Sequence, residues 1–481
     1  MPPESDPPRD ADLNALLHAQ RQAWLREPYP QWEARAGHLK ALRALLLTHG
    51  DALAEAINAD FGQRAKAETL LCELVLARQE INAALRHGPR WIKPRRRSAG
   101  KWLLPGRARV VPQPLGVVGI VAPWNYPVQL AAGPLICALA AGNRAMIKMP
   151  ELTPRTSALF AQLIGQTFAP DHVAVVNGDA SMGAAFTALA FDHLLFTGST
   201  RVGHAVMRAA AANLTPVTLE LGGKSPAIIA PDMRGARFDH AVDSLLTGKT
   251  LNAGQTCIAP DYVLLPRGLE DAFIARARQR VARLYPDFAQ NRDYTSIISA
   301  QHFARLQELA RQAQAAGAQL HPLVDIDPND PALAAQRRFV PAAVTNAPAD
   351  CALMQEEIFG PLLPLAPYDT LDDALRHINV RPRPLALYLY TGDKSTIDRV
   401  TRETVAGGMT INDTLLHNAA EGLPFGGVGA SGMGAYHGHD GFLTFSQLKP
   451  VFQQSRLNAR NWVAPPYGSR FERVIRMMLR W

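Results

Sequence analysis

Two residues of the chain have the chemistry and the neighbours of a covalent catalyst. Cys257 ends the small, polar segment Asn252–Cys257, which lets the backbone bend and leaves the sulfur open to a substrate. Glu220 stands at the end of an apolar run, just before a glycine pair, where loss of hydration would raise its pKa and suit it to act as a general base. Each also has a structural interpretation, since lone cysteines are commonly inert core residues and Glu220 has Lys224 nearby as an ion-pair partner. Neither residue decides the function by itself.

A third feature has the form of a phosphate site. The segment Phe196–Gly203 follows an apolar run and opens a helical pattern, and the free amides at the start of a helix attract phosphate. Glycines at such turns also serve packing, and the three spaced glycines of the dinucleotide fingerprint are absent. The segment is therefore compatible with a cofactor without requiring one.

The elements that would position these residues follow from the apolar pattern. Residues 11–88 carry long helical patterns. From about residue 115, short apolar runs at 117–121, 145–147, 172–176 and 194–196 alternate with helix-length segments, which indicates a parallel sheet. A second alternation runs from about 225 to 415, so we expect a domain change between 217 and 225. After Pro424 the glycine-rich chain is predicted to cross back rather than to add another strand–helix unit.

Composition favours a globular protein of two or three domains. The chain has 481 residues, of which 47% are hydrophobic and 19% charged. Its formal charge of +8 is scattered, except for Lys93–Arg97, expected to be a solvated loop, and an arginine-rich C-terminus. Because no recognisable binding module accompanies the basic run, nucleic acid is not expected as a partner. The uncharged stretch 110–143 is interrupted by five prolines, which predicts a strand, a loop and a buried helix rather than a membrane span.

The cysteine and histidine patterns argue against a metal or a disulfide framework. The cysteines, at positions 72, 137, 257 and 351, lack the close pairs of a zinc or redox site. Reduced thiols and a cytoplasmic location are therefore expected, and the N-terminus lacks the regions of a secretory signal. His437 and His439 form a His-x-His pair, which we interpret as structural, and no metal is predicted.

Seven motifs, in order along most of the chain, resemble the signatures of the aldehyde dehydrogenase family. Within that family the short N-terminus and the segments Gly254–Tyr262 and Gly426–Gly438 are similar to the class 3 branch, and most of all to bacterial coniferyl aldehyde dehydrogenases. The seven motifs are Pro123–Pro127, Lys148 with Glu151, Gly198–Gly203, Leu219–Lys224, Gly254–Cys257, Glu356–Pro361 and Pro424–Gly427.

The resemblance implies roles for the reactive residues. The Cys257 thiolate would attack the aldehyde carbon, and the Asn125 side-chain amide with the Cys257 backbone N–H would hold the oxyanion. Hydride transfer would then leave a thioester, and Glu220 would activate the water that cleaves it to a carboxylic acid. Asn125 has an alternative as a hydrogen-bonded loop residue.

A nicotinamide cofactor is the second implication of the resemblance. Glu357, rather than Glu356, would bind the nicotinamide ribose, with Phe359 packed beside it. Lys148 and Glu151 would meet the adenosine ribose, and the Glu151 carboxylate favours NAD over NADP by repelling a 2′-phosphate, although NADP stays possible. The full predicted cofactor set is Trp124, Lys148, Glu151, Gly198, Ser199, Thr200, Val202, Gly203, Leu221, Glu357 and Phe359.

The implied fold is α/β, with a Rossmann-type cofactor domain, an open-sheet catalytic domain and a small β bridging element. We predict the cofactor domain at 1–216, with 108–113 contributing to the bridging element, and the catalytic domain at 217–423. A return and bridging segment follows at 424–453, and a C-terminal tail at 454–481. The resemblance also implies a homodimer, whose bridging strands would extend a partner's sheet and cover exposed edges.

The substrate and the tail are less constrained. A hydrophobic aldehyde is expected, either aromatic or phenylpropenyl, such as coniferyl aldehyde, or aliphatic, and Tyr126 and Phe425 are candidates to line an apolar tunnel. Residues 470–481 form an amphipathic pattern with four arginines on one side, which would dock on protein or on a membrane surface. A long-chain fatty aldehyde enzyme with a membrane-associating tail is thus an alternative. Two further rivals are an enzyme passing its thioester to phosphate or coenzyme A, which would not need Glu220, and a non-catalytic structural or binding protein.

Overall fold

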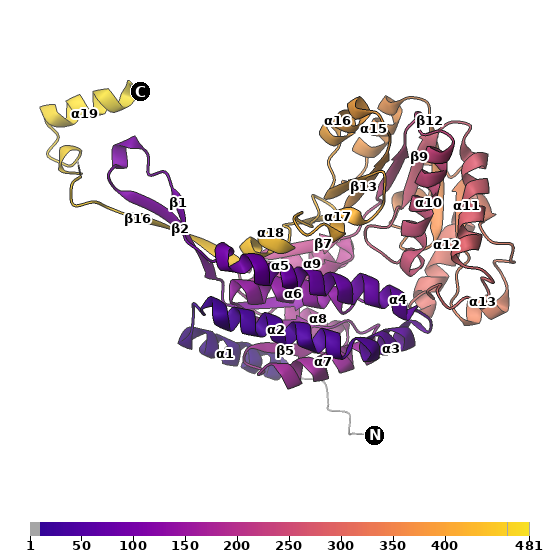
Figure 1. Ribbon diagram of the computed structural model, residues 1–481, viewed down its shortest axis with the longest axis horizontal. Helices are drawn as coiled ribbons and strands as arrows, with labels where there is room; N and C mark the ends of the chain where they lie inside the picture. Colours follow the sequence, from indigo (N-terminus) through magenta and orange to yellow (C-terminus); the bar gives the residue numbers. More distant parts are fainter. Residues whose placement is uncertain (1–9, 459, 481) are drawn as a thin grey trace.

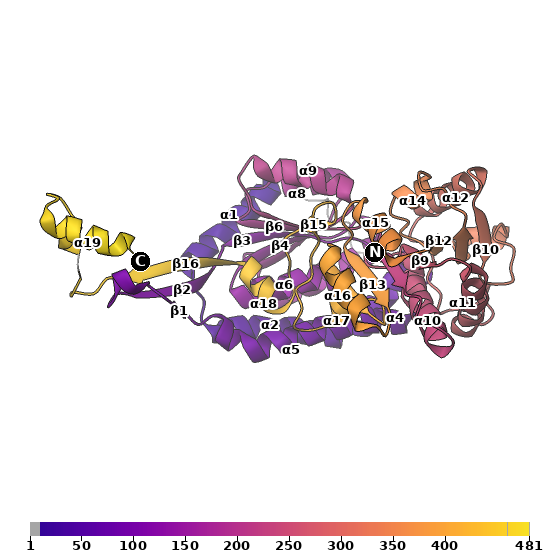
Figure 2. The same cartoon turned by 90° about the horizontal axis from the view of Figure 1, so that it is seen from above.

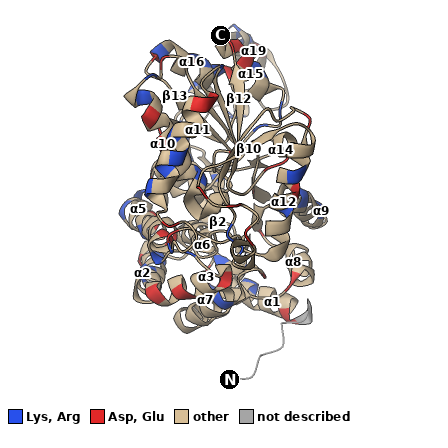
Figure 3. Cartoon of the chain, turned by 90° about the vertical axis from the view of Figure 1, so that its right-hand side faces the viewer, with Lys and Arg blue, Asp and Glu red and all other residues tan. Residues whose placement is uncertain are grey.

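The computed structural model describes residues 10–458 and 460–480 and shows two α/β lobes with a slender arm extending from one of them (Figures 1 and 2). The predicted α/β class is confirmed. Both signs of charge are spread over the outer helices in the view of Figure 3. Within the described residues, every helix is too short or too polar to span a bilayer.

The first lobe is built on a six-stranded sheet in the order β15-β7-β6-β3-β4-β5. All neighbours are parallel except β15 and β7, which are antiparallel. The strands are β3 (Val117–Val121), β4 (Arg144–Lys148), β5 (Val173–Val176), β6 (His193–Gly198), β7 (Val217–Leu221) and β15 (Gly432–Met433). Because β7 lies in this sheet, the sheet extends past the predicted domain boundary at residue 217.

Helices cover both faces of this sheet. They are α1 (Asp10–Arg26), α2 (Trp32–Thr48), α3 (Gly50–Phe61), α4 (Lys66–Thr69), the π-helix η1 (Leu70–Val75), α5 (Leu76–Trp91), α6 (Gln129–Ala141), α7 (Pro154–Thr167), α8 (Ala180–Thr187) and α9 (Thr200–Ala211). Helix α6 is buried along almost its whole length, packs on β3 and β4, and ends at the left-handed Gly142. The uncharged stretch 110–143 is therefore strand, loop and buried helix, as predicted.

The second lobe holds a seven-stranded sheet in the order β10-β11-β12-β9-β8-β13-β14, parallel except for the β10–β11 pair. The strands are β8 (Pro226–Ile229), β9 (Tyr262–Pro266), β10 (Gln319–Pro322), β11 (Ala342–Thr345), β12 (Leu362–Tyr368), β13 (Ala386–Tyr390) and β14 (Gly408–Ile411). The helices are α10 (Ala236–Thr250), the 3-10 helix η3 (Leu251–Gly254), α11 (Glu270–Leu284), α12 (Ala300–Ala315), α13 (Pro331–Ala335), α14 (Ala352–Gln355), α15 (Leu371–Asn379), α16 (Lys394–Glu403) and α17 (Leu416–Ala419).

The two lobes share one continuous apolar core. It joins Ile120 and Leu135 of the first lobe to Val263 and Leu385 of the second. Close packing of this kind limits movement of one lobe against the other.

The arm is an antiparallel sheet of three strands, in the order β1-β2-β16. The strands are β1 (Arg95–Arg97), β2 (Arg107–Pro114) and β16 (Ser446–Gln453). The basic run 93–97 was expected to be a loop, and this was wrong for Arg95–Arg97, because their backbone pairs with β2. The remaining elements near the arm are η2 (Lys101–Leu103), α18 (Gly438–Thr444), η4 (Arg460–Trp462) and α19 (Ser469–Leu479), which lies far from both lobes (Figure 1).

His437 and His439 contact different partners at the base of this arm. His437 is buried, with its Nε2 3.4 Å from Glu80 Oε1. His439 hydrogen-bonds Arg95 and lies against the rings of Trp91 and Phe442. Their surroundings support the structural interpretation.

Candidate active site

A cavity of about 560 Å³ opens at the carboxyl ends of β3, β6 and β7, where ligands of open parallel sheets commonly bind. The far wall comes from the second lobe, through the Cys257 loop, helix α12 and the segment that precedes β12. The predicted residues that line it are Trp124, Asn125, Gly198, Ser199, Glu220, Leu221, Cys257, Glu357 and Phe359.

Cys257 is presented by a tightly wound loop. Asn252 and Ala253 have φ values of 50° and 51°, in the left-handed region, and Gly254 follows with φ 76°. A Cβ on Gly254 would lie 2.4 Å from the carbonyl oxygen of Gly360, so only glycine fits. Cys257 is partly exposed to the cavity, yet burial, with help from the charges of Glu357 and Glu220, raises the pKa of its thiol to about 12. The thiol therefore keeps its proton at neutral pH until a base removes it.

Glu220 is a buried carboxyl. It lies in β7, 2% exposed, and neither of its oxygens makes a hydrogen bond with any residue that the structure describes. Burial raises the pKa of Glu220 well above its ordinary value. The alternative of an ion pair with Lys224 is wrong, because the Lys224 ammonium pairs with Asp261.

Asn125 is tied to the Cys257 loop. Its side-chain Nδ2 donates to the carbonyl of Gln255 at 3.2 Å, and its own carbonyl accepts from the Asn252 side chain at 3.1 Å. Next to it, the Tyr126 hydroxyl hydrogen-bonds the Thr256 hydroxyl at 2.8 Å. An amide nitrogen carries two hydrogens, so the second one is left for a ligand oxygen. The predicted oxyanion donor and the predicted nucleophile thus belong to one hydrogen-bonded unit.

Glu357 and Glu356 differ sharply in surroundings. Glu357 accepts a hydrogen bond from the backbone of Gly223, and burial raises its pKa to about 8. A Cβ on Gly222 would lie 2.1 Å from the Glu357 carboxylate, so the glycine makes room for it. Glu356 is exposed and lies 3.7 Å from Arg305. Phe359 packs edge-on against Trp124, with ring centroids 5.4 Å apart.

The remaining predicted cofactor residues lie outside the lining of this cavity. Lys148, at the end of β4, donates to the carbonyls of Met149 and Gly178, and its ammonium is 3.7 Å from Glu151. Thr200 and Val202 stand in the first turn of α9, whose N-cap is Ser199.

Gly203 serves packing as well, since a Cβ there would lie 2.7 Å from the Leu221 side chain. It allows α9 to approach β7 closely. The packing interpretation of the glycine turn and the cofactor interpretation therefore both fit.

A second cavity, of about 250 Å³, meets the first at Cys257. Cys257, Leu130 and Phe425 line both. Tyr126 and Phe425, predicted to line an apolar tunnel, both face this second cavity. Its other lining residues are mainly apolar: Leu71, Cys72, Leu76, Gln129, Leu251, Thr256, Ile258, Leu415, Leu416, Asn418 and Ala419.

The aldehyde dehydrogenase family model matches residues 10–451, nearly the whole chain. The chain belongs to this family. It is therefore an oxidoreductase that oxidises aldehydes, and the predicted family is confirmed. A probable coniferyl aldehyde dehydrogenase of Pseudomonas aeruginosa is 50% identical over 463 residues, which cover 96% of this chain and 95% of the relative. Aldehyde dehydrogenase family 3 member A2 of Mus musculus is 40% identical over 418 residues, covering 86% of this chain and 83% of that one.

Solved structures of aldehyde dehydrogenases share this fold. The substrate-bound state of Staphylococcus aureus AldH superposes with a TM-score of 0.90 at 35% identity, covering 97% of this chain and 99% of that one. An NAD⁺ complex of the Bacillus cereus aldehyde dehydrogenase gives a TM-score of 0.82 at 26% identity, covering 93% and 90%.

Sequence reasoning missed several residues of this aldehyde dehydrogenase that line the larger cavity, among them the polar residues His302 and Arg305. His302 and Arg305 lie one turn apart on α12 and face the cavity. Arg305 donates to the carbonyl of Ile358, and the His302 ring lies 5.0 Å from that of Trp124. The only sequence signal was their helical spacing after the N-cap Ser299, which many surface helices share.

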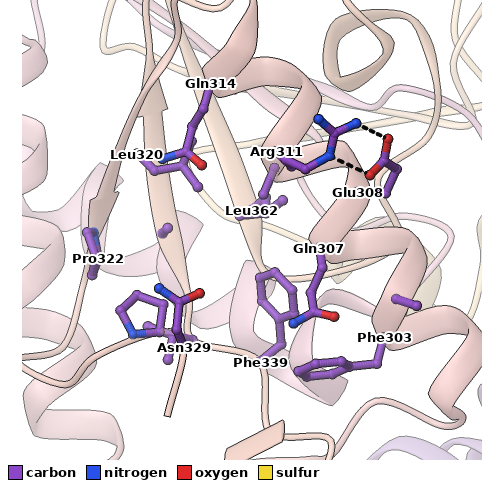
Figure 4. Close-up of a pocket in the computed structure, with 15 residues that line it drawn as sticks. Phe303, Gln307, Glu308, Arg311, Gln314, Leu320, Pro322, Asn329, Phe339 and Leu362 are labelled. Carbon is purple, nitrogen blue, oxygen red and sulfur yellow. Dashed lines mark hydrogen bonds and ion pairs between the residues drawn. The ribbon is translucent and has the colours of Figure 1, made fainter. Parts of the chain in front are cut away.

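A third hollow, of about 540 Å³, lies on another side of α12 in this dehydrogenase (Figure 4). Phe303, Phe339 and Leu320 line it, and an ion pair of Arg311 with Glu308 stands at its rim. None of the predicted site residues is among those that line it.

Proposed function

We propose that Cys257, Asn125 and Glu220 carry out the oxidation, with a hydrophobic aldehyde entering through the apolar cavity. The observation that carries this proposal is that Cys257 lies where the apolar cavity meets the cavity shared by Asn125 and Glu220. An aldehyde held in the apolar cavity would reach the Cys257 sulfur, and Asn125 and Glu220 in the other cavity would act on the adduct.

The chemistry follows from the properties of these three side chains. The Cys257 thiol gives its proton to water as the sulfur adds to the aldehyde carbon, and the free N–H of the Asn125 amide stabilises the resulting oxyanion, together with the Cys257 backbone N–H. Loss of a hydride from that carbon gives a thioester. Glu220 then takes a proton from water as the water oxygen adds to the thioester. The C–S bond breaks, the proton passes from Glu220 to the sulfur, and the carboxylic acid leaves with the thiol restored. A raised pKa suits Glu220 to accept that proton near neutral pH.

The cofactor is proposed to be NAD, with NADP possible. The residues present fit such a group: Glu357 is held against Gly222, and the first turn of α9 offers backbone amides beside Ser199. When bound, NAD supplies the hydride acceptor. Lys148 and Glu151 would hold the adenosine ribose, and the Glu151 carboxylate would repel a 2′-phosphate. Glu357 and Phe359 would orient the nicotinamide end.

The substrate class is proposed to be phenylpropenyl or another aromatic aldehyde, such as coniferyl aldehyde. The 50% identical relative, called a probable coniferyl aldehyde dehydrogenase, supports this, and so do the rings of Tyr126 and Phe425 in the apolar cavity. The apolar lining would also accept a long aliphatic aldehyde. Comparing kcat/KM for coniferaldehyde, benzaldehyde and decanal by NADH absorbance separates these classes, and a preference for decanal would overturn the aromatic assignment.

The domain division, dimer and location are also proposals. We place the cofactor domain at 1–216 with β7 added, the catalytic domain up to 423, the return and bridging segment at 424–453 and the tail at 454–481. The extended arm supports a homodimer, because one edge of its β16 strand pairs with no other described strand and a partner's sheet would cover that edge. All four cysteines are free thiols, which supports a cytoplasmic location.

The tail is proposed to dock on the partner subunit. Helix α19 has exposed Met477 and Leu479 beside Arg473 and Arg476, and in Figure 1 it lies far from both lobes. A membrane surface would suit the same residues. Deletion of residues 468–481 distinguishes the two. If the deletion abolishes co-sedimentation with anionic vesicles, the tail binds a membrane surface; unchanged co-sedimentation would exclude the membrane interpretation.

A further inference from the structure

Three charged side chains are buried together behind the proposed oxyanion donor. Arg64 precedes α4, Glu68 lies in α4 and Glu73 in the π-helix η1. The side chains of Arg64 and Glu73 are fully buried, and that of Glu68 is nearly so. A buried ion cluster is seldom a gain in stability over apolar packing, so its presence calls for another explanation. None of the three lines either of the two cavities that meet at Cys257.

This cluster forms hydrogen bonds with both ends of the segment 125–129. Arg64 Nη1 donates to the backbone carbonyl of Asn125 at 2.8 Å. Glu73 Oε2 accepts from the backbone N–H groups of Val128 and Gln129 at 2.7 and 3.2 Å, at the start of α6. Between these contacts, Arg64 Nη2 lies 3.2 Å from Glu73 Oε1. One ion pair therefore fixes both the carbonyl of Asn125 and the helix start that follows it.

The same cluster also reaches the loop of the nucleophile. The Asn125 carbonyl is shared between Arg64 and the side chain of Asn252, which also donates to the Gln255 carbonyl at 3.1 Å. Asn252 itself sits in the left-handed region, two residues before Gly254. Small shifts of the Asn125 backbone would therefore change both the direction of its side-chain amide and the position of that amide relative to Cys257. Oxyanion donors act through such fixed geometry.

We propose that Arg64 and Glu73 are positioning residues for Asn125, through which they raise the rate of thiohemiacetal formation and hydride loss. This proposal rests on the proposed function, because it assumes that Asn125 binds the oxyanion. Neither residue touches the substrate, so both act only through the backbone of 125–129. The Arg64–Glu73 pair therefore acts on the rate of the reaction and not directly on the binding of the aldehyde.

The test is the pre-steady-state burst of NADH with benzaldehyde and NAD⁺, beside steady-state kcat and KM. Loss of one oxyanion donor costs about 10²- to 10³-fold in rate, so misplacing it in Arg64→Met should lower the burst rate about 10- to 100-fold. KM for benzaldehyde should stay within about two-fold, because substrate contacts are unchanged. Arg64→Lys should recover part of the rate, and Glu73→Gln, which keeps the shape of the side chain, should lose less than Arg64→Met.

A matched control is Arg338→Met, which removes another buried guanidinium. Arg338 donates to the carbonyls of Phe288 and Asn291 and does not line the catalytic cavity. Its loss should lower thermal stability without a specific fall in the burst rate. An equal fall in burst rate for Arg338→Met and Arg64→Met would overturn the proposal.

A double-mutant cycle with Asn125→Ala separates positioning from general destabilisation. If Arg64 acts through the Asn125 amide, Arg64→Met should change the burst rate less than about two-fold once that amide is absent. If Arg64→Met lowers the burst rate as much in the Asn125→Ala background as it does in the parent, the proposal is contradicted. If Arg64→Met does not fold, Glu73→Gln takes its place in the same cycle. An Asn125→Ala enzyme with an undiminished burst would instead refute the proposed function of Asn125.

Discussion

Lys224 forms its ion pair with Asp261 and leaves Glu220 without a counter-ion in the described part of the chain. The Lys224 ammonium also donates to the carbonyls of Leu353 and Glu356, so its three hydrogens are occupied. Within residues 10–458 and 460–480, Glu220 thus keeps a buried carboxyl without a hydrogen-bond partner. Carboxyls in this condition lower stability and are found mainly where chemistry uses them.

Replacing Glu220 should therefore stabilise the folded protein. The pKa of folded Glu220 lies above its value in the unfolded chain, so its contribution to stability falls as the pH rises above about 4.5. Glu220→Gln has no such titration. We expect its Tm to match that of the parent at pH 4.5 and to exceed it by ~2 °C or more at pH 8, measured by thermal unfolding. A variant less stable than the parent at pH 8 would mean that the carboxylate has a stabilising partner.

The same substitution should separate acylation from hydrolysis. In Glu220→Gln the first turnover should still release a burst of NADH, while steady-state kcat falls about 10²- to 10⁴-fold for want of a general base. In the parent, kcat should rise with pH as Glu220 loses its proton. Cys257→Ala is the control, and should show no burst at all. A Glu220→Gln enzyme that turns over at the parent rate would remove Glu220 from the mechanism.

The types of the residues proposed to react were readable from the sequence, but their partners were not. Lys224 is close to Glu220 in the sequence, which suggested it as an ion-pair partner. In the structure Lys224 pairs with Asp261 instead, because pairing of β8 with β9 in the second lobe brings these two residues together. The direction of the Cys257 pKa shift was equally hidden. The rise in the pKa of Cys257 follows first from burial of the thiol and then from the charge of Glu357, which lies far along the chain.

Alternating apolar runs predicted the two large sheets well, because buried parallel strands have a clear composition. The edges of the sheets were harder to predict. Arg95–Arg97 form a strand only because β2 offers hydrogen-bond partners, and three arginines give no apolar signal for it. His302 and Arg305 were missed for a similar reason, since a helix face acquires its role from what it meets in space.

Narrowing the apolar cavity should select against bulky aldehydes. Cys72 lines that cavity beside Leu71 and Leu76. Cys72→Trp should lower kcat/KM for coniferaldehyde about 10-fold or more, as expected for a clash worth ~1–3 kcal/mol in an apolar pocket. Propanal should be oxidised at nearly the parent rate, and Cys72→Ala should leave both substrates little changed. If both aldehydes slow equally in Cys72→Trp, the cavity is not the route of the substrate.

Removing the carboxylate of Glu151 should relax the choice of cofactor. Glu151 is exposed, and its Oε2 lies 3.7 Å from the ammonium of Lys148. A 2′-phosphate bound near Lys148 would be repelled by Glu151, and two like charges about 4 Å apart in water differ by ~1 kcal/mol from a neutral pair. Glu151→Gln should therefore raise kcat/KM for NADP⁺ about 5-fold. Its kcat/KM for NAD⁺ should fall by less than that factor. The gain with NADP⁺ should be smaller at high salt, because screening already weakens the repulsion in the parent. Glu308→Gln, which neutralises an exposed carboxylate on α12, is the control and should leave the NADP⁺ to NAD⁺ ratio unchanged. Equal ratios in the parent and in Glu151→Gln would place the 2′-hydroxyl of the cofactor away from Glu151.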